Sequence, residues 1–183
     1  MGVVRPVSTP AAFLDRDGVL NRAIVRNGRP YPPASLAELE ILPGVPRALG
    51  ALRAAGLRLI VVSNQPDVAR GSTPQASVEA INAALMRELP LDAIRCCLHD
   101  NHHDCDCRKP RPGLLLQAAA DFDIDLSASW MVGDRWRDIE AGRAAGCHTI
   151  FIDYAYKETR PEQMDHRVAS LPEAVPIILG ELK

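Results

Sequence analysis

The stretch Phe13-Leu14-Asp15-Arg16-Asp17-Gly18-Val19-Leu20-Asn21 places two carboxylates, two residues apart, at the end of an apolar run. If Ala11 to Leu14 forms a strand, its period of two sends Asp15 and Asp17 to the same side, where both can act on one substrate atom. Such a pair suits a nucleophile and a general acid. An Asp-x-Asp-Gly string is also common in turns and calcium loops, but the glutamate that closes a calcium loop is missing at the right distance. The stretch therefore favours phosphoryl-transfer chemistry.

Apolar runs alternate with amphipathic segments along the rest of the chain. Strands are expected at Ala11–Asp15, Leu57–Ser63, Ala93–Leu98, Ser129–Gly133 and His148–Asp153. Helices are expected at Pro46–Ala55, Pro74–Leu89, Pro112–Asp121 and Arg135–Ala145. This alternation predicts an α/β domain over residues 1–183, with a parallel sheet covered on both faces. The site is then expected at the carboxyl ends of the strands, where Asp15, Ser63 and Asp134 fall.

Composition and charge exclude several classes of partner. The chain has 183 residues, 47% of them hydrophobic, with a net charge of −2, so no general excess of cations is available to hold nucleic acid. Met1 to Pro10 lacks a long apolar segment, and no apolar run reaches about 18 residues. We therefore expect no membrane partner, a cytoplasmic location, reduced thiols and a monomer.

Three further groups of polar residues follow or border apolar runs. Ser63-Asn64-Gln65 can bind phosphate oxygens, although Ser-Asn is also an ordinary turn. The pair Arg108-Lys109 places positive charge before a helix, but solvated basic residues are the commoner case. Asp134 directly follows the fourth expected strand, where an acid can also serve only as a helix cap.

The strongest metal signal is Cys97-x-His99 followed after five residues by Cys105-x-Cys107. Four such ligands in two close pairs fit tetrahedral Zn²⁺, and with no open position the ion would be structural. A loop over residues 97–107 has few apolar residues to bury, so a bound metal ion can hold it in place beside the site. A buried thiol pair with an incidental histidine is the alternative. His102 and His103 could replace His99, whereas Cys96 and Cys147 are expected to be packed thiols.

Taken in order, the four polar motifs resemble those of the haloacid dehalogenase-like phosphatases, from Ala11 to Asp153. The resemblance implies a three-layer Rossmann-like fold with a catalytic core over about residues 11–153. It also implies that Asp15 attacks phosphorus to give an aspartyl phosphate. Asp17 would protonate the leaving oxygen and later deprotonate the hydrolytic water.

The same resemblance implies a magnesium ion held by Asp15, the backbone carbonyl of Asp17 and Asp134. Ser63 and Lys109 would stabilise the transferring phosphoryl oxygens, with Asn64 helping to orient them. Asp138 is expected to be an outer or capping residue and not a ligand.

No segment has room for a folded cap domain. Residues 17–63 and 65–109 are each filled by one helix, one strand and a loop, so the site should be open. Substrate choice then falls to the long loop Asn21–Pro43 and to the loop before Lys109.

Four features together look like the branch that contains D-glycero-D-manno-heptose 1,7-bisphosphate phosphatases and histidinol-phosphate phosphatases: the zinc loop, the starting string Asp-Arg-Asp-Gly-Val-Leu-Asn, Asn64-Gln65 and the string Cys-Arg-Lys-Pro. The first substrate is a small sugar bisphosphate and is preferred here. The residues expected to contact it are Asn21, Asn64, Gln65, Arg108 and Arg135, with Arg22 or Arg26 as further cations for a second phosphate.

Histidinol phosphate is the principal alternative substrate, because its positive groups would need carboxylates, which Asp67, Asp100 and Asp104 can supply. A non-enzymatic phosphate-binding protein is less favoured, since such a protein would not need both Asp15 and Asp17. A nucleic-acid end-processing phosphatase is disfavoured by the net charge and by the lack of a basic, aromatic-laced tract.

Overall fold

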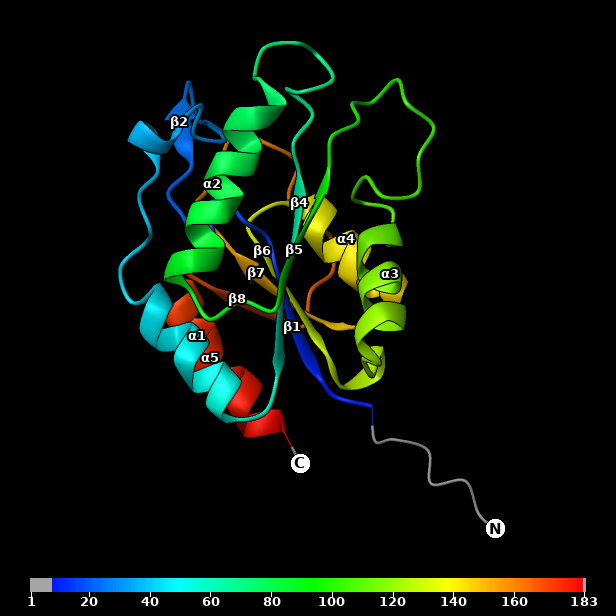
Figure 1. The fold of residues 1–183 in the computed structure, drawn as a ribbon. Coiled ribbons are helices and arrows are strands. Elements are labelled where there is room, and N and C mark those ends of the chain that lie inside the picture. Colours follow the sequence, from blue (N-terminus) through cyan, green and yellow to red (C-terminus); the bar gives the residue numbers. More distant parts are fainter. Residues whose placement is uncertain (1–7, 183) are drawn as a thin grey trace.

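A computed structural model describes residues 8–182 and places six parallel strands in one sheet (Figure 1). From one edge to the other they are β5 (Ala93–Cys97), β4 (Arg58–Asn64), β1 (Ala11–Leu14), β6 (Trp130–Gly133), β7 (His148–Ile152) and β8 (His166–Val168). Five of these strands are the expected ones. The predicted parallel α/β sheet is therefore confirmed.

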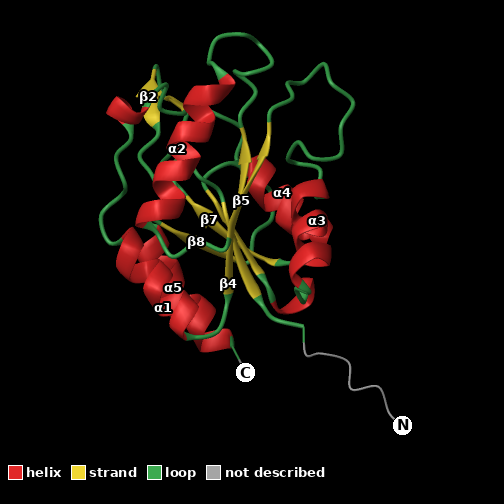
Figure 2. Ribbon diagram, viewed as in Figure 1, coloured by secondary structure: helices red, strands yellow, loops and turns green. Residues whose placement is uncertain are grey.

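Helices cover both faces of the sheet, which gives three layers (Figure 2). One face carries α1 (Val45–Ala54), α2 (Gln75–Glu88) and α5 (Leu171–Glu181), and the other carries α3 (Gly113–Phe122) and α4 (Trp136–Ala145). The apolar residues of β1 alternate between the two layers: Leu14 packs in the core under α1 and α5, and Phe13 in the core under α3. A strand buried on both sides explains why this segment is apolar throughout.

The segment Asn21–Pro43 is not the plain loop that we expected. It contains a hairpin of β2 (Ile24–Arg26) and β3 (Arg29–Tyr31), followed by the 3₁₀ helix η1 (Leu36–Glu38). Asn27 and Gly28 between the two strands both have positive φ, 53° and 79°. Asn-Gly favours this tight turn, because both residues tolerate the left-handed backbone.

The fold also extends beyond Asp153, where β8 adds an edge strand and α5 packs against α1. Neither residues 17–63 nor residues 65–109 form a separate cap domain, as expected. Within the described range, 8–182, no helix has both the length and the apolar character needed to cross a membrane.

Candidate active site and metal centres

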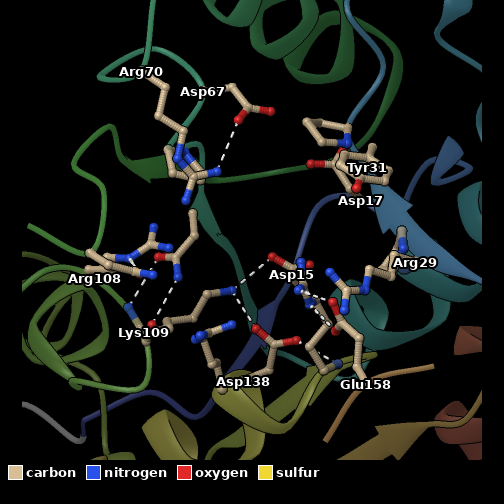
Figure 3. Close-up of a pocket in the computed structure, with 17 residues that line it drawn as sticks. Asp15, Asp17, Arg29, Tyr31, Asp67, Arg70, Arg108, Lys109, Asp138 and Glu158 are labelled. Atoms are coloured by element: carbon tan, nitrogen blue, oxygen red, sulfur yellow. Dashed lines mark hydrogen bonds and ion pairs between the residues drawn. The ribbon is translucent and has the colours of Figure 1, made fainter. Parts of the chain in front are cut away.

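The expected acids lie together at the carboxyl edge of the sheet. The backbone N–H of Asp15 donates to Val132 O at 3.0 Å, so the chain beyond β1 stays beside β6, which leads to Asp134. Asp15, Asp17 and Lys109 line a cavity of about 240 Å³ between the loops that follow the strands (Figure 3). The position agrees with the general rule for open parallel sheets.

Lys109 is the central cation of the site. Its side chain is buried, and Nζ lies 2.8 Å from Asp15 Oδ1, 2.6 Å from Val62 O and 2.7 Å from Asp138 Oδ1. Burial alone would lower the pKa of Lys109, but Asp138 and Asp15 outweigh that effect and raise the pKa above its usual value. The ammonium is therefore held charged against the two acids.

Asp15 lies in a crowded acidic environment. Burial raises its pKa to about 6, and the neighbouring carboxylates of Asp138 and Asp17 add to the rise, while Lys109 opposes it. The charge of Lys109 thus does not offset the burial of Asp15 and its repulsion from these two acids. Further positive charge at this edge would favour the ionised form of Asp15.

Asp134 has the geometry of a metal ligand. Its side chain is buried, both carboxylate oxygens lack a hydrogen-bond partner of ordinary geometry, and burial raises its pKa well above the usual value. The carboxylate fills the space beside Gly18, whose φ is 92° and whose missing Cβ would lie 2.6 Å from Asp134 Cγ. Oxygens of Asp15, Asp134 and Asp138 lie within 4.8 Å of one another. Carboxylate oxygens such as those of Asp15 and Asp134 fit Mg²⁺, which prefers hard oxygen ligands.

Asp138 belongs to this acidic group, but its oxygens are engaged by protein groups. Oδ1 pairs with Lys109, and Oδ2 accepts the backbone N–H of Arg135 at 3.0 Å, which caps α4. The expected capping role of Asp138 is confirmed.

Asp17 is held by four side-chain hydrogen bonds. Arg16 donates through Nε and Nη2 at 3.1 Å each, Asn21 through Nδ2 at 2.9 Å, and Gln65 through Nε2 at 2.7 Å. Asn21 and Gln65 are buried and do not line the cavity. Their geometry favours holding Asp17 over contacting a substrate.

Arg16 was missed by the sequence analysis. In a continuing strand it would point away from Asp15 and Asp17. The strand ends at Leu14, however, and the fully buried Arg16 side chain folds back onto Asp17 while Nη1 donates to Asn82 at 2.9 Å. Ser63 is also buried, and its hydroxyl accepts a hydrogen bond from Gln65 at 2.9 Å.

Arginines surround the mouth of the cavity. The five that line it are Arg29, Arg70, Arg108, Arg135 and Arg137. Arg70 pairs with Asp67, and Arg135 with Glu158. Within residues 8–182, neither Arg108 nor Arg137 forms an ion pair. Burial lowers the pKa of both; the charge of Arg137 lowers the pKa of Arg108 further, and the charge of Arg135 lowers that of Arg137. Within the described residues, therefore, neither guanidinium is neutralised by a direct ion pair.

The alternative cations Arg22 and Arg26 were wrong as candidates for this cavity. Arg22 forms an ion pair with Glu40 at 2.7 Å, and Arg26 lies over the ring of Tyr31 at 5.8 Å. Neither lines the cavity: Arg22 precedes the hairpin and is held against Glu40, and Arg26 lies in β2 against Tyr31. The pair Asn27-Gly28 was the sequence signal that could have indicated the hairpin.

The four expected zinc ligands converge in one cluster. Cys97 Sγ lies 3.1 Å from Cys107 Sγ and 3.8 Å from Cys105 Sγ, and His99 Nδ1 lies 3.4 Å from Cys107 Sγ. Sulfur and nitrogen atoms around a tetrahedral zinc are separated by about 3.5 to 3.8 Å, so the cluster is close to that geometry.

The other candidate ligands lie outside the cluster. His103 Nδ1 contacts Asp100 Oδ1 at 2.8 Å, and His102 is not among the converging groups. Cys96 accepts a hydrogen bond from Asn82, and Cys147 is buried in an apolar cluster. Both behave as packed thiols, as expected.

The fold and the acidic edge with its lysine define a haloacid dehalogenase-like hydrolase, and a HAD-hydrolase-like family model matches residues 106–176. A D-glycero-beta-D-manno-heptose-1,7-bisphosphate 7-phosphatase of Escherichia coli (strain K12) is 35% identical over 92% of this chain and 94% of its own length. The corresponding enzyme of Pseudomonas aeruginosa is 37% identical over 80% and 82%. The chain belongs to the family of these heptose bisphosphate phosphatases.

A solved structure supports the same assignment. The D,D-heptose 1,7-bisphosphate phosphatase of B. bronchiseptica, complexed with magnesium and phosphate, superposes with a TM-score of 0.78. It is 30% identical and covers 94% of this chain and 99% of its own. A putative HAD-like phosphatase from Mesorhizobium loti, 28% identical, has a TM-score of 0.75 over 98% and 90%.

Proposed function

We propose that this chain is a magnesium-dependent phosphatase that removes the phosphate at carbon 7 of D-glycero-β-D-manno-heptose 1,7-bisphosphate. One observation carries the proposal: the buried Asp15–Lys109 pair opens into a cavity with arginines at its mouth. The pair suits the reacting phosphate, and the arginines suit a second one. The relatives named above support this substrate.

Asp15 is the proposed nucleophile. A carboxylate oxygen of Asp15 forms a bond to phosphorus as the bond to the sugar oxygen breaks, and Asp17 gives that oxygen a proton. Asp17 then takes a proton from water, which attacks phosphorus and releases Asp15 and inorganic phosphate. Lys109 and Ser63 stabilise the charge on the transferring oxygens.

Asp15, Asp134 and the backbone carbonyl of Asp17 are the proposed magnesium ligands. When bound, Mg²⁺ supplies charge that relieves the repulsion between the Asp15 carboxylate and the phosphate. Within the described residues, the oxygens of Asp134 have no hydrogen-bond partner of ordinary geometry, which supports this assignment, as does the relative that was crystallised with magnesium.

Replacing Asp134 with asparagine should raise the magnesium concentration needed for half-maximal activity by at least about tenfold, because one charged ligand is lost. Phosphate release is measured over a magnesium titration of chelator-treated enzyme. Asp153→Asn, an acid beyond β7 that lies outside the acidic cluster, is the matched control. An unchanged magnesium requirement in Asp134→Asn would remove Asp134 from the ligand set.

Cys97, His99, Cys105 and Cys107 are the proposed ligands of a structural Zn²⁺. The loop that they close also carries Arg108, whose Nη1 donates to His99 O at 3.0 Å. Zinc would therefore fix a substrate-binding arginine as well as the loop itself. Thiolate ligands need a reducing compartment, so a cytoplasmic location is part of the proposal. A monomeric state stays a prediction.

Arg108 and Arg137 are proposed to bind the phosphate that is not cleaved. Histidinol phosphate, the alternative substrate, would need free carboxylates at the same place. Asp67 lines the cavity but pairs with Arg70 at 3.2 Å. Asp100 and Asp104 do not line it: the first bonds to its own loop, and the second pairs with Arg111. The balance of charge at the mouth thus favours a bisphosphate.

The ratio kcat/KM for heptose 1,7-bisphosphate should exceed that for histidinol phosphate by at least about tenfold, since a charge-assisted contact contributes about 1.5–3 kcal/mol. Arg108→Ala should reduce this preference in kcat/KM, because the variant loses one contact to the second phosphate. Both substrates are assayed by phosphate release with wild type and variant. The reverse preference would reassign the substrate and leave the chemistry unchanged.

A further inference from the structure

Strand β4 binds Lys109 at two places, the tip of its side chain and its backbone. At the head of the side chain, Nζ donates to Val62 O at 2.6 Å. At the backbone, the N–H of Lys109 donates to Asn64 Oδ1 at 3.1 Å, and Asn64 Nδ2 donates to Lys109 O at 3.0 Å. Val62 and Asn64 both belong to β4, which is paired with β5 on one side and β1 on the other and is therefore a rigid support.

Lys109 needs such support, because it lies in a segment without regular secondary structure. Residues 98–112 connect β5 to α3 through the cysteine loop, and no neighbouring strand pairs with the backbone of Lys109. Backbone N–H and C=O groups in a partly buried position need partners. The Asn64 amide satisfies both groups of one residue, 45 positions away in sequence.

The orientation of the Asn64 amide follows from its partners. A flipped amide would place NH₂ against the Lys109 N–H and oxygen against the Lys109 carbonyl, which is unfavourable at both contacts. Although Asn64 lines the cavity, its oxygen and one of its N–H groups are thus directed to the Lys109 backbone.

We propose that Asn64 is a positioning residue that acts through Lys109, and that it is not a direct ligand of the phosphate. By fixing the backbone of Lys109, Asn64 keeps Nζ at 2.8 Å from Asp15, where the phosphoryl oxygens develop charge. The inference rests on the proposed function only in the role given to Lys109. It departs from our expectation that Asn64 binds substrate.

A double-mutant cycle tests the proposal with Asn64→Ala, Lys109→Met and the combined variant, each with zinc content and Tm measured. In the wild-type background, Asn64→Ala should lower kcat by about ten- to a hundredfold, since small misplacements of a catalytic group cost that much, with KM changed by less than about threefold. In the Lys109→Met background the same substitution should change kcat by less than about threefold.

Arg137→Gln is the matched control, because Arg137 lines the same cavity and is proposed to contact the distal phosphate directly. Its effect on kcat/KM should be the same in both backgrounds. The contrary outcome is that Asn64→Ala lowers kcat by the same factor in the wild-type and Lys109→Met backgrounds, or that it acts mainly on KM. Either result would mean that Asn64 acts independently of Lys109, and the proposal would be overturned.

The cycle is run on p-nitrophenyl phosphate as well as on heptose 1,7-bisphosphate, so a wrong natural substrate does not obscure the outcome. A crystal structure of Asn64→Ala supplies a readout that does not require the Lys109 variant to fold. It should show Nζ displaced from Asp15, and an unmoved Lys109 would contradict the proposal.

Discussion

Replacing Asp15 with asparagine should reduce phosphate release by at least about a thousandfold, because an amide is a poor nucleophile and the covalent route is lost. The substitution keeps the shape of the side chain, and it removes one acid from a buried group of three. Folding should therefore persist, as measured by Tm and by circular dichroism. Turnover is measured on heptose 1,7-bisphosphate at saturating magnesium.

Asp67→Asn is the matched control for this experiment. Asp67 also lines the cavity, but it faces Arg70 and has no part in the proposed covalent step. It should retain turnover within about tenfold of wild type, since an exposed ion pair contributes little. If Asp15→Asn itself stays within that tenfold range, the aspartyl-phosphate mechanism is wrong.

Replacing Cys105 with serine should release about one zinc per chain and lower the free energy of unfolding by at least about 2 kcal/mol, or about 4–8 °C in Tm. Cys105 Sγ lies 3.8 Å from Cys97 Sγ in the cluster, and a hydroxyl is a poor replacement for a thiolate ligand. Zinc is measured by elemental analysis of protein purified without chelator, and Tm by calorimetry.

Cys96→Ser supplies the control, because Cys96 is the sequence neighbour of a proposed ligand but contacts Asn82 and not the cluster. It should keep its zinc, while its hydroxyl can still accept the Asn82 hydrogen bond. The absence of zinc from wild-type protein, or equal zinc content in wild type and Cys105→Ser, would contradict the proposed metal centre.

The fold was largely predictable because its signals are local. Short apolar runs that are followed by polar residues mark strands buried on both faces, as β1 and β4 are. The hairpin of β2 and β3 was missed, because each strand has only three residues and their pairing depends on the Asn27-Gly28 turn. β8 and α5 lie outside the motif-bearing region, where no chemistry drew attention to them.

The acids of the site were predictable because they follow strands directly, so the sheet places them. The residues that support those acids were not. Arg16 reaches Asp17 only because the chain turns after Leu14, and Asn82 reaches Arg16 from the middle of α2. The arginines of the mouth were predicted only in part, because Arg29 and Arg70 come from the β2–β3 hairpin and the loop after β4, whose paths depend on tertiary packing.

Gly18 and Asp134 lie far apart in the sequence but in contact in the structure. A Cβ atom at position 18 would clash with the Asp134 carboxylate. The side chains that can be accommodated at position 18 are thus limited by Asp134, a proposed metal ligand that follows a different strand. Gly18 has no functional group, yet a comparison of many family sequences should find it as invariant as the acid beside it. Invariance of that kind reflects excluded volume and not reactivity, and mutational scans that score only side-chain chemistry would overlook it.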